Sequence, residues 1–307
     1  MAPIVPPGEL VFGIQLPVQA QSKYFVEDWE LGAGPAEVAA VAQAADRAGF
    51  FYVAVCDHVV IPDELADRMS SVWWDTIATL GWLAAQTAQT RLLSSVFNLT
   101  YRHPLVGAKS FATLDLLSAG RVIIGVGAGH VEQEFTALGI DFASRGKALD
   151  EGLRVLDTVL RDGAVDGMQL EPRPVQTPRP PIWVGGSAPA AVRRAARLAD
   201  GWLPQGTPLD QMPPLVDLYR SERGRVTGNG DTGDIGAISE WLYVGEPAWD
   251  VNRACTSGSP EQLAAALRQW AVVGVNHLQV RFPSRSAAEL ADQVTAFGTE
   301  VGPLLKG

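Results

Sequence analysis

Cysteine and lysine are scarce in this chain of 307 residues. Only two cysteines occur, Cys56 and Cys255, which excludes a disulfide framework and a cysteine-based metal cluster. Four lysines stand beside twenty arginines, these basic residues are scattered, and the net charge is −10. The sequence therefore argues against nucleic-acid binding and against docking on an anionic membrane.

Long apolar runs and targeting signals are also missing. No stretch is long and apolar enough for a transmembrane helix, and residues 1–8 lack the charged and apolar regions of a secretory signal. We therefore expect a cytoplasmic protein. The hydrophobic content of 47% supplies ample core. The proline-rich stretch 171–181 is too short to link independent domains, so residues 1–307 are expected to form a single domain.

Eight apolar segments predict strands, and a helix-like segment follows each one. The expected strands are residues 10–16, 50–56, 91–97, 122–126, 181–186, 201–203, 236–244 and 277–282. The expected helices are residues 36–48, 73–87, 104–117, 131–138, 143–161, 188–199, 212–223, 260–272 and 286–305, and residues 59–72 are expected to form a long loop. Consecutive strands with helical crossovers run parallel. Eight such units favour a closed (β/α)8 TIM barrel with loop insertions, with an open Rossmann sheet as the alternative.

Barrel enzymes place their chemistry where the strands end. The residues at those ends are Gln15, Asp57, His58, Asn98, Gly127 to His130, Gly185 to Ser187, Gln205 and Arg281. Two of the four histidines, His58 and His130, would therefore share one face of the barrel. We expect His103, just before a helix, and His277, at the start of a strand, to be structural. Tyr24, Trp73 and Trp74 lie near long loops and are candidates for the walls of a pocket.

Metal and nucleophilic catalysis are poorly supported. Asp57, His58 and His130 could supply three ligands, but no carboxylate-rich cluster accompanies them, and the first strand has no His-x-His motif. No serine or cysteine has an evident histidine partner. A metal-dependent hydrolase is thus the third alternative, and no metal ligands are predicted.

Two strands end in glycine turns that precede helices. They are Gly127-Ala128-Gly129 and Gly185-Gly186-Ser187. Backbone N–H groups at such turns can hold a phosphate. Two of these turns on the same face as two histidines indicate a phosphorylated cofactor.

Several segments together resemble the bacterial luciferase-like superfamily. They are Asp57-His58, residues 108–129, Phe135 to Gly139, residues 181–187 followed by residues 199–202, and residues 259–278. The resemblance implies a (β/α)8 barrel that binds either FMN or the deazaflavin coenzyme F420. Asp-His after the second strand resembles the F420-dependent branch, whereas the flavin monooxygenases more often have Glu-His. The arginine and alanine bias indicates a GC-rich genome, which agrees with an actinobacterial origin.

The resemblance also assigns roles to single residues. His58 would lie near C5 of the deazaflavin and exchange a proton, His130 would assist, and Asp57 would lie by the ring. A non-prolyl cis peptide between Ser95 and Val96 would bulge against the ring. The other expected cofactor contacts are Gly127, Ala128, Gly129 and Gln133 along the ring and ribityl chain, and Gly185, Gly186 and Ser187 at the phosphate.

One position departs from the sugar-phosphate dehydrogenases of that branch. They carry a proton-donating Glu where this chain has His130, and the chain also lacks a cluster of Lys and Arg suited to a substrate phosphate. We therefore predict an F420-dependent oxidoreductase that transfers a hydride between C5 and a small organic substrate. An FMN-dependent monooxygenase and a cofactor-binding protein without turnover are the alternatives. The resemblance further implies a homodimer.

Overall fold

The computed structural model describes residues 2–228 and 231–306. Eight parallel strands close into a ring, because the last strand pairs with the first. In ring order they are β1 (Val11–Gln15), β2 (Tyr52–Val55), β3 (Arg91–Ser94), β5 (Val122–Gly127), β8 (Ile182–Gly185), β9 (Gly201–Leu203), β10 (Asp234–Val244) and β12 (His277–Arg281). The predicted (β/α)8 barrel is confirmed, and the open sheet was the wrong alternative.

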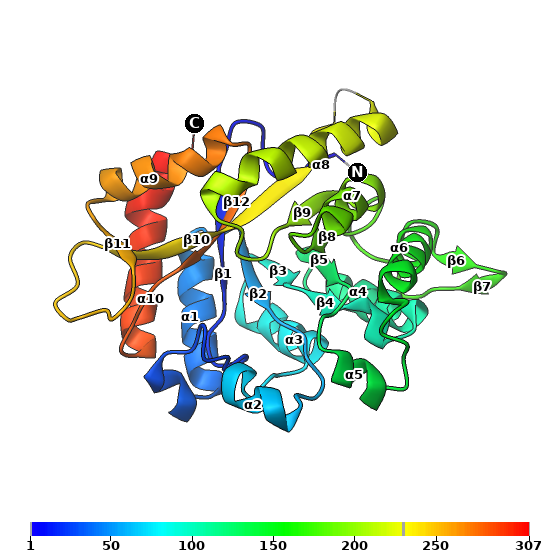
Figure 1. Cartoon of the computed structure of the whole chain (residues 1–307), viewed down its shortest axis with the longest axis horizontal. Coiled ribbons are helices and arrows are strands. Elements are labelled where there is room, and N and C mark those ends of the chain that lie inside the picture. Colours follow the sequence, from blue (N-terminus) through cyan, green and yellow to red (C-terminus); the bar gives the residue numbers. More distant parts are fainter. Residues whose placement is uncertain (1, 229–230, 307) are drawn as a thin grey trace.

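Helices follow each strand and cover the outside of the ring (Figure 1). The outer helices are α1 (Pro35–Arg47), α3 (Thr76–Gln86), α4 (Pro104–Leu117), α6 (Arg145–Asp162), α7 (Pro189–Leu198), α8 (Met212–Thr227), α9 (Pro260–Val272), α10 (Ala287–Ala296) and α11 (Gly302–Leu305). Proline stands in the first turn of several of them, where its missing N–H costs nothing. In α6 the buried residues Leu149, Leu153, Leu156 and Leu160 follow the helical period and face the sheet. The predicted helices are confirmed to within a few residues.

Four features differ from the expected elements. The strand expected at 91–97 is divided into β3 and β4 (Phe97–Asn98) at Ser95-Val96. The expected loop 59–72 contains α2 (Asp63–Met69), a helix of seven residues that buries none of them. A polar strand, β11 (Cys255–Gly258), extends the sheet beyond β10. A small hairpin of β6 (Ala164–Val165) and β7 (Met168–Gln169) turns at Asp166-Gly167.

His277 helps to fill the interior of the barrel where the strands begin. Its ring is fully buried and stacks on Trp183 with centroids 4.2 Å apart, and Tyr52 packs against it edge-on. Burial lowers the pKa of His277 to about 3, so the ring is neutral at neutral pH. The expected structural role of His277 fits this environment. Aromatic rings therefore fill the barrel interior at this end.

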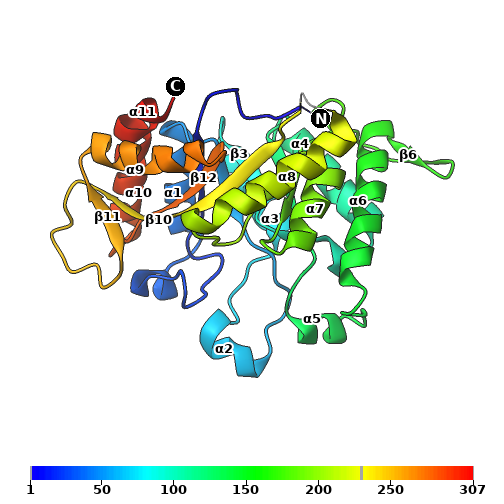
Figure 2. The same cartoon turned by 45° about the horizontal axis from the view of Figure 1, so that its top comes forward.

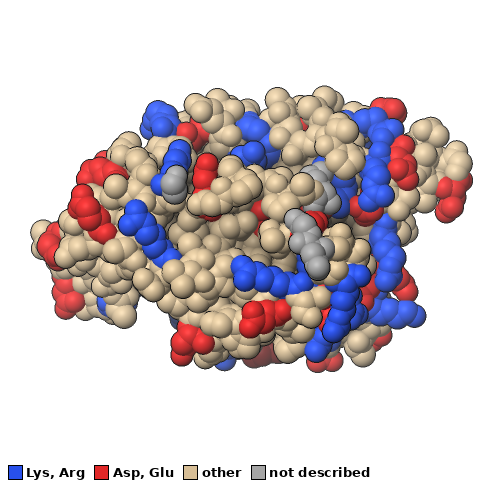
Figure 3. Space-filling model, turned by 90° about the horizontal axis from the view of Figure 1, so that it is seen from above, with Lys and Arg blue, Asp and Glu red and all other residues tan. Residues whose placement is uncertain are grey.

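The loops at the carboxyl ends of the strands form a separate face of the molecule. In Figures 1 and 2, α2 and α5 (Glu132–Ala137) lie together at the lower edge, whereas both termini lie at the upper side. Basic and acidic side chains stand next to one another on the face that carries the termini (Figure 3). No helix in residues 2–228 and 231–306 is long and apolar enough to cross a membrane.

Candidate active site

A cavity of about 430 Å³ opens at the carboxyl ends of the barrel strands. Many of the residues predicted at strand ends line it: Gln15, Asp57, His58, Asn98, His130, Gln205 and Arg281. Ser95 and Val96, expected from the resemblance, line it as well. Tyr24 and Trp73 also line the cavity, as expected, whereas Trp74 is not part of its wall. Residues that are far apart in the sequence thus come together because the closed ring brings every strand end to one rim.

His58 is held by a buried carboxylate. It follows β2, and its Nδ1 lies 2.7 Å from Oε2 of Glu134 in α5, whose side chain is fully buried. Glu134 also accepts hydrogen bonds from the backbone N–H of Val59 at 2.8 Å and from the hydroxyl of Tyr101 at 3.0 Å. Burial acts to raise the pKa of Glu134, but the hydrogen bond and charge of His58, with the other donors, bring that pKa below its usual value. Glu134 is therefore an anion.

This contact determines which nitrogen of His58 carries the proton. A carboxylate can only accept, so Nδ1–H donates to Glu134 and Nε2 carries the lone pair in the neutral ring. Nε2 makes no hydrogen bond to the described part of the chain, and His58 lines the cavity. The Nε2 atom is thus a base available to a bound molecule, and the imidazolium that forms on protonation is stabilised by Glu134.

His130 lies beside His58, as the strand ends predicted. The two ring centroids are 5.5 Å apart and the rings are nearly perpendicular, at 86°. Trp73 packs on His58 as well, with centroids 4.4 Å apart. His130 lies at the exposed rim of the cavity. Partial desolvation and the nearby His58 lower the pKa of His130 below 6.5, and Glu134 acts in the opposite direction. His130 is consequently neutral at pH 7 and can accept or donate a hydrogen bond.

Asp57 lines the cavity but its oxygens are already occupied. Both oxygens pair with Arg102, at 2.7 and 2.9 Å, and one also accepts from the backbone N–H of Asn98 at 2.8 Å. The carboxylate is almost completely buried. These bonds join the end of β2 to the segment after β4, so Asp57 fixes the position of the neighbouring His58.

The peptide bond between Ser95 and Val96 is cis, as the resemblance implies. Two of the predicted glycines adjoin Val96: a Cβ placed on Gly127 would lie 2.6 Å from its Cγ2, and one on Gly185 would lie 2.7 Å from its Cγ1. Both contacts are closer than real Cβ atoms allow. Gly127 and Gly185 are therefore required because Val96 occupies the space that a side chain would fill.

The remaining predicted cofactor residues lie outside the cavity wall. Gln133 donates a hydrogen bond to Glu64 in α2 at 3.0 Å, which joins α5 to α2. The hydroxyl of Ser187 accepts from the backbone N–H of Gln205 at 2.9 Å and lies 2.7 Å from the hydroxyl of Thr207. Gly129 has a positive φ of 77°, with the ring of Phe135 close to its Cα hydrogens. All the predicted cofactor contacts stay predictions: Asp57, Ser95, Val96, Gly127, Ala128, Gly129, Gln133, Gly185, Gly186 and Ser187.

Glu134 and Arg102 are the site residues that the sequence did not reveal. Glu132, Gln133 and Glu134 are adjacent polar residues on a short helix, and only Glu134 is buried. The sequence of this segment does not show which of the two carboxylates, Glu132 or Glu134, is buried. His130 precedes α5, so no helical spacing relates it to Glu134, and the sequence offered no signal for this carboxylate.

A family model described as luciferase-like monooxygenase matches residues 12–233. This chain belongs to that family. An F420-dependent glucose-6-phosphate dehydrogenase of Microbacterium testaceum is 31% identical to this luciferase-like protein over 219 residues, which cover 65% of this chain and 62% of that enzyme.

Two solved structures are similar to this luciferase-like protein in fold. The monooxygenase RslO1 from Streptomyces bottropensis has a TM-score of 0.75 and 22% identity, covering 96% of this chain and 99% of its own. A coenzyme F420 dependent tetrahydromethanopterin reductase from Methanopyrus kandleri has a TM-score of 0.74 and 19% identity, covering 97% of this chain and 100% of its own.

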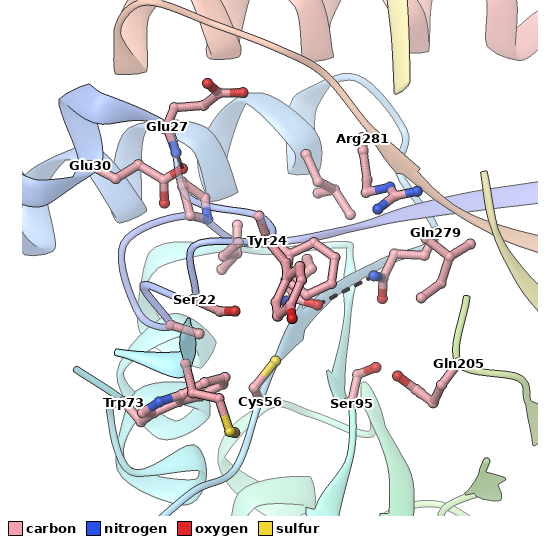
Figure 4. Close-up of a pocket in the computed structure, with 18 of the residues that line it drawn as sticks. Ser22, Tyr24, Glu27, Glu30, Cys56, Trp73, Ser95, Gln205, Gln279 and Arg281 are labelled. Carbon is pink, nitrogen blue, oxygen red and sulfur yellow. Dashed lines mark hydrogen bonds between the residues drawn. The ribbon is translucent and has the colours of Figure 1, made fainter. Parts of the chain in front are cut away.

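The cavity of this luciferase-like protein suits a largely apolar ring with polar edges. Ile14, Leu16, Pro17 and Val96 supply apolar walls. The indole of Trp73 and the hydrogen-bonding groups of Ser95 and Gln205 lie around the same cavity (Figure 4). Cys56 also faces the cavity, and burial raises the pKa of its thiol to about 12, so it adds no negative charge. No group of three or more metal-binding side chains occurs in the described residues. The wall thus presents the apolar surfaces and hydrogen-bonding groups that an organic ring would contact.

Proposed function

We propose that this protein is an F420-dependent oxidoreductase that transfers a hydride between C5 of the deazaflavin and a small organic substrate. The observation that carries the proposal is His58, which is fixed by Glu134 and faces the cavity that the cis Ser95-Val96 peptide also lines. The Asp57-His58 pair and the similarity to an F420-dependent dehydrogenase support this cofactor over FMN.

The residues of the cavity would divide the task as follows. Ser95 and Val96 would support the ring, with Asp57 holding the adjoining backbone. The expected contacts further along the cofactor are Gly127, Ala128, Gly129 and Gln133 for the ribityl chain, and Gly185, Gly186 and Ser187 for the phosphate. When bound, the deazaflavin supplies the two-electron hydride chemistry.

His58 moves the proton that accompanies the hydride. In the direction of oxidation, a substrate hydroxyl gives its proton to Nε2 as its carbon loses the hydride, and the carbonyl product leaves. In the direction of reduction, the imidazolium returns that proton to the oxygen. Glu134 stabilises the charged ring in both directions, and the neutral His130 orients the substrate oxygen at the rim.

An FMN-dependent monooxygenase is the second candidate, because the family model and one similar structure are described as monooxygenases. Two assays on the same preparation distinguish the activities. With reduced F420 under nitrogen, a panel of ketones and aldehydes should be reduced, and the matching alcohols should reduce oxidised F420. With reduced FMN in air, oxygen uptake should not exceed that of free FMN. Substrate-dependent oxygen uptake with FMN would favour the monooxygenase, and saturable binding without turnover in either assay would indicate a binding protein.

A further inference from the structure

Arg281 is a partly buried cation in the wall of the cavity, and no acidic residue of the described chain pairs with it. It ends β12, and its Nε and Nη2 donate to one backbone carbonyl, that of Ser239, at 3.1 and 2.7 Å. No carboxylate of the described residues lies within 4.0 Å of its guanidinium, and its Nη1 makes no hydrogen bond among them. Burial lowers the pKa of Arg281, because the charged guanidinium is less well solvated there than in water.

The acidic residues around Arg281 are engaged elsewhere. Glu27 pairs with Arg253 at 3.2 Å. Glu30 accepts hydrogen bonds from the backbone N–H groups of Val18 and Glu27, at 2.6 and 2.9 Å. Glu240 opposes the lowering of the pKa of Arg281, but it is hydrogen-bonded to Trp270 rather than to the guanidinium. Within residues 2–228 and 231–306, no neighbour therefore supplies a direct counter-ion.

A second cation increases the positive potential at this place. The ring of Trp241 lies 5.1 Å from the guanidinium of Arg281 and 4.3 Å from that of Arg253. Burial raises the pKa of Glu27 to about 7 against the opposing effect of Arg253, so the one carboxylate that pairs with Arg253 is itself only partly ionised at neutral pH. A negative group on a ligand would be attracted to this end of the cavity.

Arg281 and the candidate base lie in the same cavity. Gln279 and Arg281 are two residues apart on β12, which directs both side chains to one face, and Gln279 donates to Gln15 at 3.3 Å across the cavity wall (Figure 4). The wall around Arg281 is apolar and aromatic, with Tyr24, Phe25 and Trp241. A molecule held at Arg281 therefore needs an apolar body.

We propose that the substrates are apolar organic acids whose carboxylate pairs with Arg281 while the reacting group lies at His58; this rests on the function proposed above. A carboxylate matches the planar guanidinium and needs one cation. A phosphate ester carries more charge, and the only other cation in the described cavity wall is Arg68, an exposed residue of α2. The substrate class thus differs from sugar phosphates.

Binding to the apoprotein tests this without any cofactor. The probes are 4-phenylbutyrate and its neutral amide, followed by the fluorescence of the cavity tryptophans and by calorimetry. Wild-type protein should bind the acid about tenfold or more tightly than the amide, as expected for one desolvated ion pair. Arg281→Met should remove this preference, Arg281→Lys should keep part of it, and Arg68→Met should leave it within about twofold of wild type.

Equal affinities for acid and amide, no detectable binding of the acid at millimolar concentration, or an unchanged preference in Arg281→Met would each overturn the proposal. Thermal melting of the three variants shows whether they are folded. Arg281→Lys keeps the charge, so it distinguishes loss of the cation from damage to the wall. A preference for acids in a protein that fails to bind F420 would reject the proposed cofactor and leave the anion site established.

Discussion

Replacement of His58 by Asn is expected to reduce turnover by a factor of about 10² to 10⁴ and to change the affinity for F420 by less than about twofold. The amide of Asn can hydrogen-bond to a substrate as the imidazole of His58 does, but it has no basic nitrogen. The variant can therefore orient a substrate but cannot accept its proton. Turnover is measured under nitrogen with saturating substrate, and affinity is measured by fluorescence titration. The large difference between the two effects is the signature of a proton carrier.

His103→Asn is the matched control for this substitution. His103 is exposed at the start of α4, where it accepts a hydrogen bond from the N–H of Leu105, and Asn is also well suited to that position. Its turnover should equal that of the wild-type protein. Equal losses of turnover and cofactor affinity in His58→Asn would count against proton transfer and would indicate that His58 only supports the cofactor.

Replacement of Glu134 by Gln is expected to reverse the tautomer of His58. The amide NH2 of Gln would donate a hydrogen bond to Nδ1, so the ring proton would move to Nε2. Nε2 could then no longer accept a proton from the substrate. Turnover should fall by about tenfold to 100-fold with little change in KM, since the shape of the cavity is kept. The ¹⁵N chemical shifts of the His58 ring report the tautomer directly, and a structural role alone would not change them.

Glu134→Ala should also destabilise the fold, by about 3–5 kcal/mol, because it leaves His58 and the N–H of Val59 without their buried acceptor. The sign of the pH dependence follows from the lowered pKa of Glu134. The ionised carboxylate stabilises the folded state above pH 4.5, its pKa when unfolded, and this contribution is lost as the pH falls through the lower folded value. Denaturant unfolding between pH 7 and 3 measures it.

Glu132→Gln is the control on the same helix, because Glu132 is exposed two residues away. It should be close to the wild-type protein in turnover, in stability and in its dependence on pH. A Glu134→Gln variant with wild-type turnover and an unchanged His58 tautomer would exclude the positioning role of Glu134.

The barrel could be predicted because its elements carry local signals. Fully buried parallel strands, such as β5, are continuous apolar runs, and proline in the first turn marks the starts of helices. The helix α2 was missed because it is only seven residues long, is rich in charged residues and buries none of its side chains. The polar strand β11 exists through backbone pairing with β10, which no side-chain pattern records.

The site was predictable where topology alone determines it. Strand ends of a closed ring meet, so His58, His130 and Arg281 had to lie on one rim. The burial of Glu134 depends on how α5 docks against the loop after β2, which is a property of tertiary packing. The reason for Gly127 and Gly185 was also hidden, because the atom that excludes a side chain belongs to Val96, some thirty and ninety residues earlier in the chain.

Titration of the apoprotein with F420 and with FMN, in parallel and followed by quenching of ligand fluorescence, tests the proposed cofactor most directly. F420 should bind saturably with one site per chain and with at least about tenfold higher affinity than FMN. Saturable binding of FMN with no binding of F420 would contradict the account, and His58 would then have to be understood in a flavin enzyme.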